Sequence, residues 1–103
     1  GGVSSFRPGS VPADAILFSR VNRQTLDVLN LLLKAGTAPA ADFSFTIDLD
    51  GASQTKTLPA GQAQQTFDID AVVGSGTELR VTGQSTADSS LADVRCSFKV
   101  ATT

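Results

Sequence analysis

Residues 43–50 read FSFTIDLD, with an apolar side chain at every odd position and a polar one at every even position. Alternation with a period of two is typical of a β-strand that turns one face to a core and the other to solvent. Gly51 follows directly, and an Asp-Gly dipeptide suits the positive φ angles of a tight hairpin turn. We therefore predict a strand here and a return strand over 53–58, which ends because Pro59 cannot donate to a sheet.

The same alternation recurs along the rest of the chain. Further strands are predicted over 64–72, 78–82 and, most regularly, 92–100, where apolar residues alternate with charged residues and serine. The segment 15–21 is apolar and then alternating, which adds another strand. Turn-forming stretches rich in Gly, Pro and Ser separate these segments. The pattern predicts an all-β fold, an antiparallel β-sandwich or jelly-roll-like arrangement of six to eight strands.

The N-terminal segment has a different character. Residues 1–13 contain two prolines and Gly9, which predicts an extended N-terminal arm. Residues 14–103 then form a single β-sandwich domain, because a chain of 103 residues has room for one hydrophobic core. Cys96 is the only cysteine and cannot form a disulfide within the chain, so we expect folding in a reducing compartment.

Residues 25–35 allow two conformations. Leu26, Leu29 and Leu33 fall at helical spacing, and Gly36 is a suitable helix stop. The neighbouring β segments instead favour a short strand over 25–28, followed by a connection over 30–40. Periodicity alone leaves both conformations open.

The composition argues against an enzyme. The chain has no His, Trp, Tyr or Met, and only 17% of its residues are charged. Without His, the most common general base and zinc ligand is missing. A net charge of −2 and no apolar run near 18 residues argue against nucleic acid and against membrane insertion.

Two Asp-x-Asp pairs are the remaining candidates for chemistry. Asp48 and Asp50 share one strand face, as do Asp68 and Asp70, and facing pairs of carboxylates can hold Ca²⁺ or act in glycoside hydrolysis. The alternation already explains all four as outward polar positions, and neither segment has the form of a Ca²⁺ loop. We therefore expect no metal site, no cofactor and no catalytic residue.

Apolar residues that the alternation leaves unplaced are candidates for a subunit contact. They belong to the N-terminal segment and to the leucine-rich stretch, where part of the cluster is expected in the core and the remainder on the surface. The candidates are Val3, Phe6, Val11, Leu29, Leu31 and Leu33.

The order of segments resembles small β-sandwich domains of tailed-bacteriophage virion proteins, especially tail-fibre and related distal modules. The resemblance covers nearly the whole chain: the arm with Pro8-Gly9, the strand 15–21, the connection 35–40 and the alternating 43–47. Its most specific part is the closing stretch 87–94. One departure is the run Asn30-Leu31-Leu32-Leu33-Lys34, where the family pattern has small residues.

The resemblance implies a non-enzymatic virion structural protein, a tail-fibre, spike or appendage module that contributes to attachment at the host surface. Its implied partners are other virion proteins, further copies of itself in a homo-oligomer (a trimer first), and a glycan or protein of the host surface. Its implied location is the virion, assembled in the bacterial cytoplasm. The alternatives are a capsid decoration protein and a carbohydrate-binding module of a larger protein, the latter weakened by the absence of Trp and Tyr.

Overall fold

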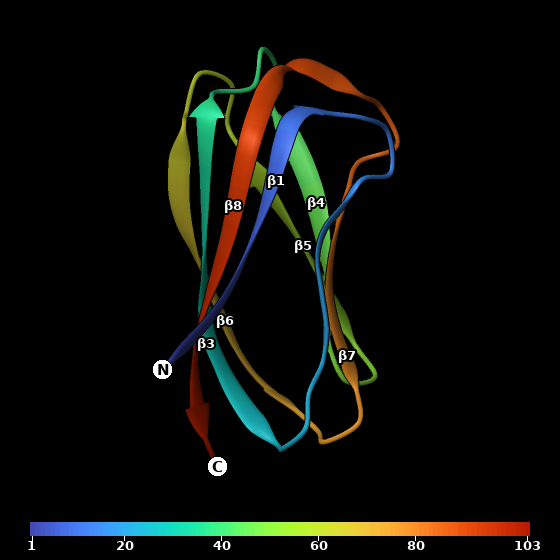
Figure 1. The fold of residues 1–103 in the computed structure, drawn as a ribbon, viewed down its shortest axis with the longest axis vertical. Helices are drawn as coiled ribbons and strands as arrows, with labels where there is room; N and C mark the ends of the chain where they lie inside the picture. Colours follow the sequence, from blue (N-terminus) through green and yellow to red (C-terminus); the bar gives the residue numbers. More distant parts are fainter.

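Eight strands form two antiparallel sheets of four strands each (Figure 1). The computed structural model describes residues 1–103 in full. In chain order the strands are β1 (Gly2–Val11), β2 (Ile16–Val21), β3 (Leu26–Thr37), β4 (Phe43–Asp48), β5 (Ser53–Leu58), β6 (Gln64–Val73), β7 (Glu78–Gly83) and β8 (Asp88–Thr102). The first sheet has the order β1-β8-β3-β6 and the second β2-β7-β4-β5. The chain contains no helix that could cross a membrane.

This strand order is that of a jelly roll. β1 pairs with β8, β2 with β7, β3 with β6 and β4 with β5, so the chain is one long antiparallel hairpin of eight strands. The hairpin is rolled up so that β8 also pairs with β3, and β7 with β4, which closes two Greek keys. The predicted all-β sandwich of jelly-roll type is confirmed.

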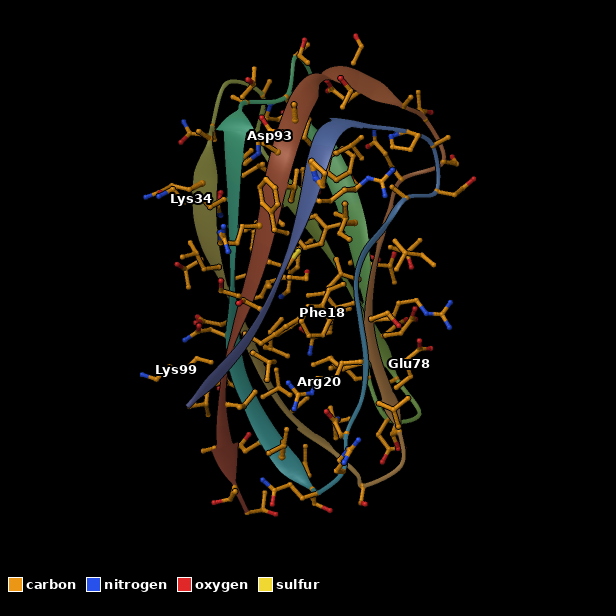
Figure 2. The ribbon with its side chains drawn as sticks, viewed as in Figure 1. Phe18, Arg20, Lys34, Glu78, Asp93 and Lys99 are labelled. Carbon is orange, nitrogen blue, oxygen red and sulfur yellow. The ribbon has the colours of Figure 1, made fainter.

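The core lies between the two sheets and contains 24 buried apolar residues. Two aromatic pairs join the sheets. Phe18 of β2 contacts Phe98 of β8, with ring centroids 4.8 Å apart, and Phe45 of β4 contacts Phe67 of β6 at 5.1 Å. Figure 2 shows Phe18 pointing into the space between the sheets. Both pairs meet edge to face, a favourable arrangement of the ring quadrupoles.

The hairpin predicted from residues 43–58 is confirmed. β4 begins at the predicted Phe43 and ends at Asp48, and β5 has the predicted bounds 53–58. In the turn between them Gly51 has a φ of 71°, and the N–H of Leu49 donates to the carbonyl of Ala52 at 2.8 Å. On the outer face the hydroxyl groups of Ser44 and Thr57 lie 3.2 Å apart. The abundant Ser and Thr thus include cross-strand polar pairs.

Residues 25–35 are neither a helix nor a short strand with a connection. β3 runs without interruption from Leu26 to Thr37, and its pairing shifts by one residue between Val28 and Asn30 on both sides. The shift places the next inward side chain at Leu31 rather than at position 30. Because this irregularity breaks the period of two, the leucines imitate helical spacing.

The N-terminal segment is extended, and in this structure it is paired. β1 lies along β8 from Gly2, opposite Lys99, to Val11, opposite Asp88, with irregularities on both sides of Ser10. It therefore forms an edge strand of the first sheet in the same chain. Both chain ends lie together on this sheet (Figure 1).

Gly83 is needed at a close approach inside the sandwich. A Cβ atom there would lie 2.9 Å from Cζ of Phe43, whose ring is fully buried. We expect Gly83→Ala to lower the free energy of unfolding by about 1–2 kcal/mol through overpacking. Urea unfolding followed by circular dichroism measures the loss. In a Phe43→Leu background the same change should cost less, and an equal cost in both backgrounds would exclude this ring contact as the cause.

Candidate functional site

The structure divides the six apolar contact candidates into two groups. Val11, Leu31 and Leu33 are at most 1% exposed and pack in the core, so their side chains face the opposite sheet rather than a neighbouring subunit. Val3 and Leu29 are half-buried, and Phe6 is 52% exposed. Of the six, only Phe6 therefore presents a large apolar surface to solvent.

Other exposed apolar residues were not among the candidates. Ile16 and Val21 lie at the two ends of β2 and are 53% and 60% exposed, and Val72 of β6 is 55% exposed. β1 and β2 are the edge strands on the same side of the sandwich, joined where the Ser5 hydroxyl donates to the carbonyl of Leu17 at 2.7 Å. A groove of about 370 Å³ lies along this seam and is lined in part by Phe6 and Ile16.

The four aspartates of the Asp-x-Asp pairs do not form one cluster. No group of three or more His, Cys, Asp or Glu side chains is placed to hold a metal ion. Asp50 instead accepts a hydrogen bond from the N–H of Gly74 at 3.2 Å, which ties two turns together. Asp70 has a φ of 53° at the irregularity of β6, a conformation that Asp tolerates better than most residues.

The one cysteine is a core residue. Cys96 is buried in β8, and burial raises the pKa of its thiol to about 12, with the Ser5 hydroxyl opposing that shift only in part. At pH 8 on the order of one molecule in ten thousand would carry the reactive thiolate. We expect the folded protein to resist a disulfide reagent such as DTNB and to react promptly in urea. Rapid labelling of the native protein would contradict this environment.

An exposed ion pair lies on the second sheet. The Nε and Nη2 atoms of Arg80 donate to Oε1 of Glu78, and the hydroxyl of Ser19 donates to Oε2 at 2.6 Å. The hydrogen bonds from Arg80, and then from Ser19, hold the pKa of Glu78 below its ordinary value. Figure 2 shows Glu78 on the outer side of this sheet, and all its partners lie within the chain. It is a surface contact between strands.

Asp88 is a buried carboxylate that sequence analysis missed. Its oxygens accept hydrogen bonds from the N–H groups of Ser90 and Leu91 at the start of β8 and of Ala40 and Ala41 in the β3–β4 loop. Desolvation by burial favours a higher pKa for Asp88, but these N–H donors together hold its pKa below the ordinary value. Asp88 therefore fastens a loop to a strand, and it begins β8, which starts before the strand predicted over 92–100.

The outer face of the first sheet brings together residues that are far apart in the sequence. The register sets Arg95 of β8 opposite Phe6 on β1 and opposite Lys34 on β3. The guanidinium carbon of Arg95 lies 5.2 Å from the centre of the Phe6 ring, a cation–π contact. Lys34 and Asp93 lie at the same end of this sheet, and Lys99 lies toward the other end (Figure 2).

The structure is a jelly roll with exposed apolar residues on edge strands and a charged depression on the outer face of the first sheet. No family model matches the chain, and no curated protein matches it. Among solved structures, the chain is similar to PRD1 vertex protein P5, with 10% identity, a TM-score of 0.57 and 95% of each chain covered. A structure of infectious bursal disease virus, Gt strain, matches with 16% identity and a TM-score of 0.32, over 97% of this chain and 29% of that one. The likeness to the vertex protein shows a shared fold.

Proposed function

We propose that the protein is a non-enzymatic structural protein of a bacteriophage virion, in the form of a spike, fibre or similar appendage module that contributes to host attachment. The observation that carries the proposal is the jelly roll itself, which is similar to a vertex protein over 95% of each chain. The fold alone does not fix a function. A composition without His and surfaces suited to contact also support the proposal.

Electron microscopy of virions labelled with gold-conjugated antibody against this chain tests the proposal. Label at vertices, spikes or tail appendages is the expected result. Label spread over the faces of the head would favour the alternative of a decoration protein that reinforces the capsid lattice. Absence of the chain from purified particles would overturn both and would favour a binding module of a larger protein.

Self-association belongs to the same proposal, with a trimer as the expected state. The surface that supports it best is the edge strand β2, because its backbone pairs on one side only and it carries exposed Ile16 and Val21. Edge strands with exposed apolar side chains readily pair with another chain. A second copy of this chain is the partner that we propose for this edge.

The β2 edge gives a testable prediction. We expect Ile16→Lys combined with Val21→Lys to reduce the mass found by light scattering from that of a trimer to that of a monomer, with the circular dichroism unchanged. Val72→Lys is the control. Val72 is 55% exposed on β6, an edge strand of the first sheet, whereas β2 is an edge strand of the second sheet. Dissociation by the control alone, or a monomeric parent protein, would contradict the proposed edge.

A further inference from the structure

We propose that the outer face of the first sheet binds one carboxylate-bearing sugar residue, in the depression formed by β1, β8 and β3. The inference rests on the proposed attachment function, for which it names the class of receptor. The depression has a volume of about 330 Å³ and is lined by Phe6, Lys34, Ala35, Gly36, Asp93 and Arg95. Ligand pockets start at about 300 Å³, so this volume suits a single sugar residue.

Neither Lys34 nor Arg95 forms a salt bridge within the chain. Lys34 and Arg95 are directly opposite each other on neighbouring strands, and two like charges in that position destabilise a sheet. The one ion pair of the protein, Arg80 with Glu78, lies on the other sheet. An anion bound between Lys34 and Arg95 would relieve their repulsion, which accounts for two cations placed side by side.

The charge balance indicates a single negative charge on the ligand. Lys34 and Arg95 contribute two positive charges to the lining and Asp93 one negative charge, so the lining carries a net charge of one. A planar guanidinium group binds a carboxylate through two parallel hydrogen bonds. The carboxylate of Asp93 repels groups of higher charge, such as a phosphate monoester, and a chain with a net charge of −2 does not favour polyanions in general.

The remaining lining residues suit the ring of a sugar. Phe6 offers an apolar wall, held in place by the guanidinium group of Arg95. Oδ1 of Asp93 accepts the N–H of Gly9 at 2.9 Å, which fixes the side chain and leaves Oδ2 to accept a hydrogen bond from a sugar hydroxyl. Gly36 keeps this place open, because a Cβ there would lie 3.3 Å from Oδ2.

Binding of purified protein to immobilised polymers tests the site directly. The probes are polysialic acid and alginate, whose sugar residues carry carboxylates, with neutral dextran and dextran sulfate, which carries sulfate groups and no carboxylate, for comparison. We expect retention on at least one carboxylated polymer and none on dextran or dextran sulfate. Arg95→Ala should weaken that binding about tenfold or more, because it removes the paired charge-assisted hydrogen bonds.

Two further variants separate the site from general charge effects. Arg23→Ala removes the same charge from the exposed β2–β3 loop and should leave binding unchanged. Asp93→Asn keeps a residue that tolerates the φ of 57° and should allow dextran sulfate to bind. Circular dichroism establishes that each variant is folded.

The outcomes are separable from those of the microscopy. Failure of both carboxylated polymers to bind, equal loss with Arg23→Ala and Arg95→Ala, or equal retention of dextran sulfate by the parent protein would overturn the sugar site. None of these results would affect the proposed virion role, which depends on where the gold label lies. Absence of label from particles would leave a measured sugar site intact and would assign it to a protein of another kind.

Discussion

Phe45→Ala is expected to lower the free energy of unfolding by about 3–5 kcal/mol. Phe45 is 1% exposed, and its ring on β4 meets Phe67 of β6 at 5.1 Å across the two sheets and stacks on Phe43 at 6.4 Å. Truncation removes the apolar transfer energy of the ring and leaves a cavity that rigid sheets on both sides fill poorly. The free energy of unfolding of a domain of this size is about 5–15 kcal/mol, so the variant should unfold at a much lower urea concentration than the parent protein.

The measurement is urea unfolding followed by far-ultraviolet circular dichroism, because a chain without Trp or Tyr gives little intrinsic fluorescence signal. Phe6→Ala is the matched control, since its ring is 52% exposed and its contact with Arg95 contributes only about 0.5–1 kcal/mol. Phe45→Leu retains more side-chain volume and provides a measurable transition if the alanine variant does not fold. Equal losses for Phe45→Ala and Phe6→Ala would contradict the assigned core.

The strands that sequence analysis predicted well are those whose two faces meet different surroundings. Residues 43–48 and 92–100 alternate because one face packs against the opposite sheet and the other faces solvent. The polarity of each residue therefore indicates which face of the sheet it occupies. The hairpin turn at Gly51 could also be predicted from the sequence, because its positive φ depends on residues adjacent in the chain. Both features can therefore be predicted from residues that are neighbours in the sequence.

β3 could not be predicted from the same rule. The one-residue shift after Val28 depends on how β6 and β8 pair with this strand, and these partners lie about 40 and 70 residues away in the chain. The single-sequence pattern contains the consequence, inward Val28 followed by inward Leu31, but not the cause. The same interruption leaves the buried Leu26 and Leu33 an odd number of residues apart, so that with Leu29 they match helical spacing when the neighbouring strands are unknown.

The candidate sugar site was beyond sequence analysis for a related reason. Phe6, Lys34 and Arg95 are unremarkable singly, and only the register of β1, β8 and β3 sets them side by side. Phe6 was predicted as an apolar contact residue. The structure adds its charged neighbours Arg95 and Lys34, which indicate the kind of ligand that could bind there. Composition could exclude histidine-based catalysis, whereas binding depends on which strands become neighbours.

Asp88 had a local signal that the alternation rule overlooked. An aspartate followed by Ser89-Ser90 suits a turn in which the carboxylate accepts the N–H groups two and three residues ahead, and Asp88 accepts those of Ser90 and Leu91 at 2.9 and 3.0 Å. The two further donors come from Ala40 and Ala41, which no local pattern could reveal. The two hydrogen bonds from Ser90 and Leu91 were therefore predictable from the sequence, and those from Ala40 and Ala41 were not.

Asp88→Asn is expected to lower the free energy of unfolding at pH 7 by about 3 kcal/mol. The carboxylate accepts from four backbone N–H groups, whereas an amide has a single accepting oxygen and would turn its NH₂ group toward some of those donors. The side chain at position 88 is only 7% exposed, so water has poor access to it and cannot fully replace the acceptor that Ser90 and the buried Leu91 lose.

The pH dependence distinguishes this charge effect from a packing effect. The pKa of Asp88 is lower in the folded protein than the ordinary 3.8, so its stabilisation is present above pH 3.8 and is lost as the pH falls through the folded value. The difference in unfolding free energy between the parent protein and Asp88→Asn should therefore be constant from pH 7 to 5 and shrink below pH 3.8. Asp68→Asn, at an exposed aspartate, is the control for a changed net charge. A difference for Asp88→Asn that stays the same down to pH 2 would mean that shape rather than charge fastens the β3–β4 loop to β8.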